Sequence, residues 1–182
     1  NIQQYVQELR ESPEREMRSL LNALNGGFIA PSPGGDAVRN PNTLPTGRNL
    51  FGINAEATPG ARAWDEGKAL AKSTLDRYYR KHGEYPRKVS YTFWAGEFIE
   101  TEGATLAQAL YMLGVAPVRD GMNRVTDLRL IPSAELGRPR IDVVVQTSGQ
   151  LRDVAASRLE LLTKAVKMVA QSENDTCGNY VS

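Results

Sequence analysis

The order of strand-like and helix-like segments constrains the fold of this 182-residue chain more than any other feature. The expected strands are residues 88–94, 116–119, 126–131 and 141–147. The expected helices are about 58–81, 105–113, a single turn around 133–136, and 153–170. The segment 141–147 is almost continuously apolar, which is typical of a strand covered on both faces. This order predicts an α/β fold with a mostly parallel sheet of about four strands flanked by helices.

The chain divides into four predicted regions. Residues 1–27 form a helical segment with a break or restart at Pro13, where Ser12 can cap the new helix. Residues 28–60 form a glycine- and proline-rich loop, 61–170 the α/β domain, and 171–182 a loosely ordered tail. Because the sequence starts at Asn1 and its end shows no clear stop to a fold, we interpret it as a fragment of a larger multidomain protein.

Composition and motifs exclude several classes of function. The 22 Lys and Arg residues balance 21 Asp and Glu, so no overall charge attracts nucleic acid or a membrane surface. No apolar run approaches the roughly 20 residues that span a bilayer, and we expect a cytoplasmic protein. The single cysteine, Cys177, predicts an exposed tail thiol, and the single histidine, His82, a solvent-facing residue at a helix end. No phosphate-binding glycine motif is present.

The loop at 26–52 concentrates polar and turn-forming residues that could hold a ligand. Asp36 offers a carboxylate, Arg39 and Arg48 offer guanidinium groups, and Asn49 follows directly. Arginine suits bidentate contact with a carboxylate on a ligand. The alternative is that these side chains bond one another and simply order the loop. Both interpretations stay open from the residues alone.

Parallel sheets gather ligands at the carboxyl ends of their strands. We therefore expect residues 95–97 and 148–153 to lie on one edge of the sheet. Glu97 is the candidate there for proton transfer or for holding a hard cation, while Glu100 and Glu102 are more simply explained as solvated. Arg152 stands at a helix start, which can receive an anion.

A charged residue beside the apolar strand has a simpler explanation. For Asp142, which begins that strand, we predict a structural ion pair.

Three segments together resemble the large subunit family of cobaltochelatase and magnesium chelatase. They are PGGDAVRNPNTLPTGRNLFG at 33–52, GEYPRKVSYTFWAGEFIETEGATLAQALYMLGVAPV at 83–118 and GRPRIDVVVQTSGQLRD at 137–153. The resemblance covers about residues 26–170.

This resemblance implies an interior piece of a much longer, cytoplasmic protein that binds a tetrapyrrole, namely a corrin, a porphyrin or haem, in a cavity between domains. Partner subunits of the AAA+ type hydrolyse ATP with Mg²⁺ and drive metal insertion, which explains why no nucleotide motif occurs here. The fragment alone is expected to hold no cofactor and to be inactive, and the exchanged metal is Co or Fe.

The resemblance also implies roles for the residues. Asp36, Arg39, Arg48 and Asn49, with Arg152, would bind the macrocycle, and Glu97 would be the catalytic and metal-handling carboxylate. Magnesium-inserting relatives carry a glutamate in the segment matching 103–106, where this chain has Ala104. This departure points away from magnesium and towards cobalt insertion. The alternative is a haem-handling branch that removes iron from haem or carries haem.

Overall fold

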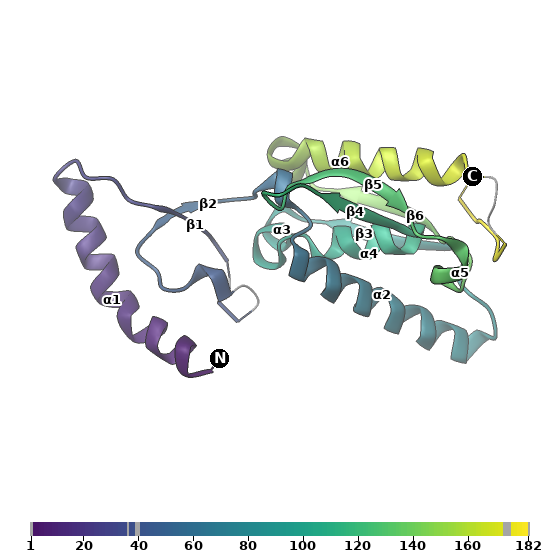
Figure 1. Ribbon diagram of the computed structural model, residues 1–182, viewed down its shortest axis with the longest axis horizontal. Helices are drawn as coiled ribbons and strands as arrows, with labels where there is room; N and C mark the ends of the chain where they lie inside the picture. Colours follow the sequence, from purple (N-terminus) through teal and green to yellow (C-terminus); the bar gives the residue numbers. More distant parts are fainter. Residues whose placement is uncertain (1, 36, 39–40, 173–175, 182) are drawn as a thin grey trace. The chain divides into compact units, whose positions relative to one another are not determined.

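The computed structural model describes residues 2–35, 37–38, 41–172 and 176–181. The chain divides into two compact units (Figure 1). One comprises Asn1–Ile53 with Ile99–Thr101, and the other comprises Asn54–Phe98 with Glu102–Ser182. The boundary at residue 53 falls inside the region that the sequence predicts as a loop.

The first unit is a helix with a loop folded onto it. Its elements are α1 (Ile2–Leu24), β1 (Pro31–Pro33), the 3-10 helix η1 (Pro41–Thr43) and β2 (Asn49–Phe51), with β1 and β2 paired in parallel. The Thr46 amide donates to the Ser12 hydroxyl at 3.0 Å. Gly47 has φ +84°, and a Cβ there would lie 2.7 Å from the Arg15 carbonyl carbon. Only glycine fits this close approach of loop to helix.

Helix α1 runs through Pro13 without the predicted break. A proline inside a helix removes one backbone hydrogen bond, which bends a helix without having to end it. Side-chain contacts one turn apart flank this position, including Arg15 with Glu11 at 3.1 Å and Arg18 with Glu14 at 2.7 Å. The Ser12 hydroxyl donates to the Glu8 carbonyl at 2.8 Å, so it acts within the helix and does not cap a new one.

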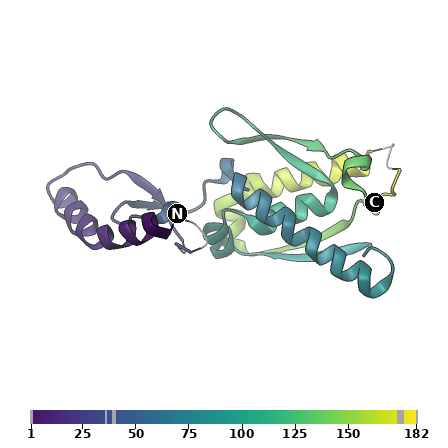
Figure 2. The ribbon, with the colours of Figure 1, turned by 60° about the horizontal axis from the view of Figure 1, so that its bottom comes forward.

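From residue 54 onwards, helices and strands alternate. The elements are η2 (Ala55–Ala57), α2 (Ala61–His82), β3 (Lys88–Phe93), α3 (Ala95–Thr101), α4 (Ala104–Leu113), β4 (Val115–Arg119), β5 (Val125–Leu130), α5 (Ser133–Leu136), β6 (Asp142–Thr147) and α6 (Gly149–Ala170). β3 pairs with β6 in parallel, whereas β4 and β5 form an antiparallel hairpin that stands out from the helices (Figure 2).

The predicted α/β class with parallel strand pairing is confirmed. The described strands form three separate two-stranded sheets, where the sequence predicted one sheet of about four strands. β4 and β5 are joined by the short turn at residues 120–124, and a connection that short imposes an antiparallel pair. Two of the four predicted strands therefore pair only with each other.

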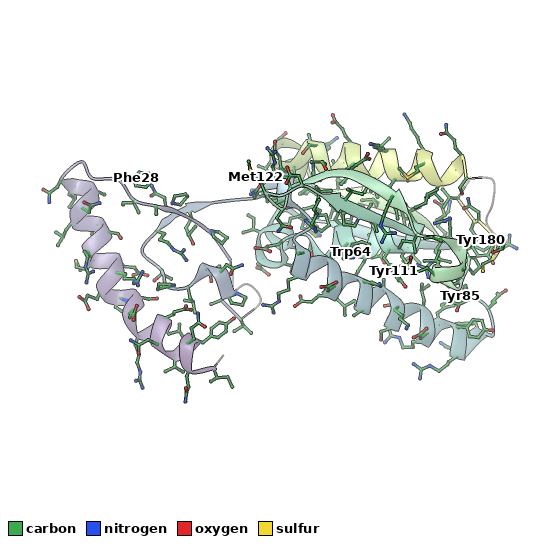
Figure 3. All side chains as sticks on the ribbon, viewed as in Figure 1. Phe28, Trp64, Tyr85, Tyr111, Met122 and Tyr180 are labelled. Atoms are coloured by element: carbon green, nitrogen blue, oxygen red, sulfur yellow. The ribbon has the colours of Figure 1, made fainter. Side chains whose placement is uncertain are left out.

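Helix α4 is the centre of the core. Eight of its residues are buried, because α2, α6 and the β3–β6 pair all contact it. Trp64 of α2 meets Tyr111 of α4 edge to face, with ring centroids 6.4 Å apart (Figure 3). None of the helices in the described residues is long and apolar enough to span a membrane.

The described tail residues 176–181 are tied to the start of β6. Asn179 forms a parallel bridge with Arg140, and its side-chain amide donates to the Val169 carbonyl at 2.8 Å. Cys177 is exposed, as the sequence predicts. His82 is exposed at the end of α2 as predicted, stacked on Tyr78 with ring centroids 4.3 Å apart.

Candidate functional site

The carboxyl ends of β3 and β6 meet at one edge of the sheet. Phe93 pairs with Thr147, and the Ser148 amide donates to the Phe93 carbonyl at 3.1 Å. α3 begins directly after β3, and α6 directly after β6. We call residues 94–97 and 148–152 the rim. The prediction that these two segments share one edge is confirmed.

The start of α6 gives the rim positive character. Ser148 is the N-cap, and its hydroxyl accepts from the Leu151 amide at 3.2 Å. Arg152 lies in the first turn with an exposed side chain. Free amides of a first helical turn carry partial positive charge, and the guanidinium adds a full one. These groups favour an anion, and the exposed carboxylate of Asp153, which follows Arg152, opposes them in part.

Glu97 lies in the first turn of α3 and reaches the start of α4. Its Oε1 accepts from the Thr105 amide at 3.2 Å and from the Thr105 hydroxyl at 2.7 Å. The N-cap of α4 is Gly103, which has no side chain to satisfy these first amides. The Glu97 carboxylate thus holds two helix starts together at the rim, beside the buried Ala104.

The described residues do not complete a metal site around Glu97. Within the described ranges, no group of three or more His, Cys, Asp and Glu side chains could hold a metal ion. The roles predicted for Glu97 in catalysis and metal handling remain predictions.

Helix α3 was not foreseen from the sequence. Residues 95–101 are helical, and the helix ends at Glu102, which has φ +54°. The seven residues of α3 are too few to show a helical period, and the nearby Gly96 and Gly103 suggest a turn. Glu100 therefore lies on a helix, whereas the sequence predicted an acidic loop.

Only part of the predicted loop site lies within the described residues. The Arg48 Nη2 donates to the carbonyls of Asn42 at 2.9 Å and Leu44 at 3.0 Å. The Asn49 amide donates to the Ala30 carbonyl at 3.0 Å, which begins the β1–β2 pair. These bonds order the loop. Asp36 and Arg39 lie outside the described residues, so the predicted contact of all four with a macrocycle is untested.

Two arginines of the GRPRIDV segment are buried and bind backbone carbonyls. Arg138 donates to the carbonyls of Tyr111 and Met112, and Arg140 to those of Gly114 at 2.6 Å and Ile131 at 2.8 Å. We call this the arginine cage. It satisfies carbonyls that the end of α4 leaves open. The Arg138 guanidinium also lies 4.8 Å from the centre of the Tyr111 ring.

Asp142 and Arg158 also have structural partners, as Arg138 does. Burial lowers the pKa of Arg138 from its usual value, and a guanidinium nevertheless stays charged at neutral pH. Asp142 binds Lys88 at 2.7 Å across the β3–β6 pair, so the predicted structural ion pair is confirmed. Arg158 is buried and donates to the Thr58 carbonyl at 3.0 Å.

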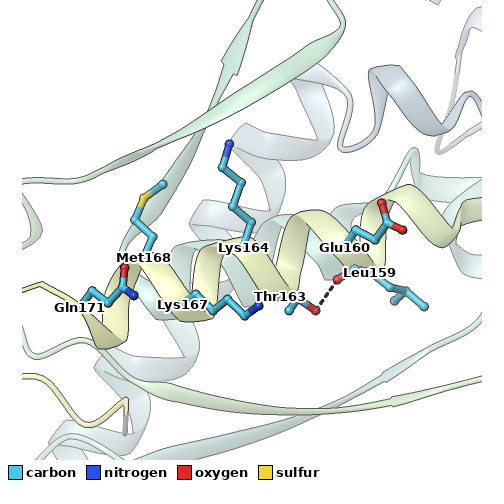
Figure 4. Close-up of a pocket in the computed structure, with 7 residues that line it drawn as sticks. All are labelled: Leu159, Glu160, Thr163, Lys164, Lys167, Met168 and Gln171. Carbon is cyan, nitrogen blue, oxygen red and sulfur yellow. Dashed lines mark hydrogen bonds between the residues drawn. The ribbon is translucent and has the colours of Figure 1, made fainter.

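A hollow of about 780 Å³ lies along α6 and has no carboxylate pair or arginine cluster. Its described lining residues come from α6 and its C-cap (Figure 4): Leu159, Glu160, Thr163, Lys164, Lys167, Met168 and Gln171. Lys164 is already paired with Asp127 at 2.7 Å. The rim is the better candidate site, because side chains and helix starts from two strand ends converge there.

Known proteins show what this fold is similar to. A family model described as CobN/Magnesium Chelatase matches residues 1–182. The magnesium-chelatase subunit ChlH of Oryza sativa subsp. japonica, a chloroplastic protein, is 41% identical over 169 residues, which is 92% of this chain and 12% of that protein. The aerobic cobaltochelatase subunit CobN of Sinorhizobium sp is 38% identical over 169 residues, which is 92% of this chain and 13% of that protein.

A solved structure agrees with these sequence matches. The catalytic subunit of cobaltochelatase from Mycobacterium tuberculosis superposes with a TM-score of 0.82 at 41% identity, over 96% of this chain and 15% of that one. The chain thus spans 12% to 15% of the length of these three relatives. Because the family model matches every residue from 1 to 182, the chain belongs to the CobN/magnesium chelatase family.

Proposed function

We propose that this chain is part of the large subunit of an ATP-dependent metal chelatase, which binds a tetrapyrrole and supports metal insertion into the macrocycle. The observation that carries the proposal is the likeness to the catalytic subunit of cobaltochelatase, with a TM-score of 0.82 at 41% identity. At that identity, over nearly the whole chain, the likeness extends beyond a shared fold. The activity belongs to the complete protein, of which this chain would be a small part.

The rim supplies groups that suit this chemistry. Metal insertion requires the ring nitrogens to lose protons, and a positioned carboxylate can accept them. Glu97 is the carboxylate that we assign to this role, because Thr105 fixes its Oε1 at 2.7 Å and 3.2 Å. Since no cluster of metal ligands surrounds it in the described part of the chain, Glu97 would meet the metal ion only as the cargo passes to the ring.

The peripheral carboxylates of the macrocycle need positive partners. We assign Arg152 at the start of α6 to one of them, because its side chain is exposed beside the N-terminal amides. We also assign Arg48 and Asn49, with Asp36 and Arg39, to binding of the macrocycle in the complete protein. The two loop bonds of Arg48, to the Asn42 and Leu44 carbonyls, are both donated by its Nη2.

The energy source would be a partner chain. AAA+ subunits binding ATP and Mg²⁺ fit the lack of a nucleotide motif in this sequence. We place the assembly in the cytoplasm. The exchanged ion would be Co or Fe.

A second candidate function is haem handling, in which the protein removes iron from haem or carries it. The start of α4 favours this candidate over magnesium insertion. Ala104 is buried there and cannot bind a metal or a proton. Removal and insertion both require a flat ring to be bound and its protons to be exchanged.

The test uses the complete protein with its AAA+ partners. Metal-free porphyrin or corrin is followed by absorbance with ATP and Co²⁺, and haem is followed in parallel for the appearance of the metal-free ring. We expect Glu97→Gln to slow the metal exchange by about 100-fold or more, the usual worth of a positioned general base. Glu135→Gln, an exposed carboxylate of α5, is the matched control and should keep the full rate.

Each outcome assigns a function. Spectra that change only with Co²⁺ and ATP support insertion, and a metal-free ring released from haem supports removal. Binding without any spectral conversion identifies a carrier. Full exchange in Glu97→Gln contradicts the role of this carboxylate, and unchanged ring affinity in Arg48→Ala contradicts the role of the loop arginine.

A further inference from the structure

Trp94 presents its indole ring on the open face of the β3–β6 pair. Side chains alternate between the two faces of a strand, and on β3 Phe93 is buried whereas Thr92 is exposed. Trp94 still has extended backbone angles, φ −114° and ψ 140°, so the alternation continues through it. Its side chain therefore lies on the same face as Thr92, at the last position before α3 begins.

The ring is strongly exposed for a residue of its type. Trp94 is 61% exposed, although tryptophan is on average among the well-buried residues. As the N-cap of α3 it makes no side-chain cap bond, and its ring meets no other aromatic ring among the residues that the structure describes. Nothing in the described fold uses this large apolar surface.

The space in front of the rim is clear. A Cβ added to Gly96 or to Gly149 would find no atom within 4 Å. The first residue after Trp94 is the small and buried Ala95. Neither glycine position is crowded by other side chains.

The neighbouring groups favour a ligand over a protein surface. The exposed face of the pair carries Ser90, Thr92 and Gln146 beside Val144, which is a largely polar surface and not the apolar one that a packed domain requires. Arg152 and the start of α6 add positive charge at the same edge. The ligand chemistry that matches is a flat, conjugated ring with carboxylate substituents.

We infer that Trp94 is a stacking residue for the tetrapyrrole, with its indole against the face of the macrocycle at the rim. The inference rests on the proposed function and adds a ring contact to it. An aromatic stack is worth about 3- to 10-fold in affinity, and the contact is equally available before and during metal exchange. Such uniform binding lowers KM and leaves kcat almost unchanged.

The experiment measures protoporphyrin IX binding by absorbance titration of the complete protein and of three variants at this position. Trp94→Ala and Trp94→Leu should bind 3- to 10-fold more weakly with kcat retained, and Trp94→Phe should recover most of the affinity. Leucine keeps apolar volume without an aromatic face, so it separates stacking from simple burial. Trp64→Phe is the matched control, because the Trp64 ring packs against Tyr111 of the core.

A second measurement needs no variant. Mild oxidation of tryptophan, mapped to residue 94 by mass spectrometry, should be fast in the ligand-free complete protein and slow with saturating protoporphyrin. The inference is overturned if Trp94 is oxidised equally with and without the ring, or is already protected without it. It is also overturned if Trp94→Leu binds as tightly as the unchanged protein.

The two proposals can fail separately. A complete protein that binds no tetrapyrrole at all removes the proposed function and this inference together. Normal binding and metal exchange in Trp94→Ala removes only the inference. A Trp94→Ala variant with a lower melting temperature and unchanged ring affinity assigns the indole to packing against the rest of the polypeptide.

Discussion

At the scale of single residues, the arginine cage shows that a motif which resembles the family can have a structural role and no catalytic one. The GRPRIDV segment could be noticed in the sequence as charged residues entering an apolar strand. Its partners could not, because Arg138 and Arg140 bind carbonyls 26 to 27 residues earlier in the chain, at Tyr111, Met112, Leu113 and Gly114. Backbone acceptors leave no signal in a sequence. This motif builds the fold, and the catalytic chemistry must be sought elsewhere.

Tyr91 provides a prediction about pH. Burial raises its pKa to about 12 from the usual 10.0, and the positive charge of Arg138 opposes part of that rise. Below pH 10 the phenol is protonated in both the folded and the unfolded chain. Between pH 10 and 12 only the unfolded chain loses the proton, so the free energy of unfolding falls, by roughly 2 to 3 kcal/mol over that range.

The comparison is between the unchanged protein and Tyr91→Phe, with urea unfolding measured at pH 8, 10 and 11.5. Phenylalanine cannot ionise, so the variant should lose less stability above pH 10. Tyr78→Phe, a tyrosine of α2 outside the core cluster, is the control. Parallel pH profiles for the unchanged protein and Tyr91→Phe would contradict the raised pKa.

At the scale of elements, the end of α4 depends on one glycine. Gly114 has φ +74°, and a Cβ there would lie 2.3 Å from the Arg140 Nη1. Gly83 ends α2 with the same φ of +74° but with no atom within 4 Å of the added Cβ. The two positions share the backbone strain and differ only in crowding.

Alanine substitutions at both positions measure the crowding. Gly83→Ala should cost about 1 kcal/mol, the penalty of a left-handed residue with a side chain. Gly114→Ala should cost at least about 2 kcal/mol more in urea unfolding, because Arg140 must leave carbonyls that are otherwise unsatisfied. Equal losses at the two sites would show that the cage tolerates the methyl group.

Most of the longer elements and the short helix α5 could be predicted from sequence, whereas α3, β1 and β2 could not. Apolar periodicity located α2, α4 and α6 and four of the strands to within a few residues. β1 and β2 have three residues each, and one of them reads Pro-Ser-Pro, which carries no strand signal. Pro13 was wrongly expected to break α1, since the helix runs through it from Ile2 to Leu24.

The sequence predicted that the candidate site lies at one edge of the sheet, but it did not predict the side-chain contacts there. Topology alone brings the ends of β3 and β6 together, and this was confirmed. The hydrogen bonds that Thr105 donates to Glu97 depend on the path of the chain through α3. The spacing of apolar residues does not predict that path. For Trp94, the sequence predicted only that it belongs to the strand 88–94. Strand alternation through residue 94 was the signal that could have placed it outside the core.

At the scale of the whole molecule, the chain spans 12% to 15% of the relatives reported above, so its site should be incomplete alone. A cavity between domains loses most of its walls when one part is isolated. We expect residues 1–182 to bind protoporphyrin IX at least 10-fold more weakly than the complete protein does. Isothermal titration of both, at the same pH and salt, measures the difference. Equally tight, stoichiometric binding by residues 1–182 would contradict a cavity shared with the other domains.

The positions of the rim and the arginine cage have a thermodynamic consequence. Both features involve α4 and β6: the rim lies where α4 begins and β6 ends, and the cage where α4 ends and β6 begins. A ten-residue helix is about 15 Å long, so the two sites are further apart than the 7 to 10 Å beyond which mutational effects usually add. Substitutions that change the specificity of the rim for a metal or ring should therefore leave the contribution of the cage to the free energy of unfolding unchanged.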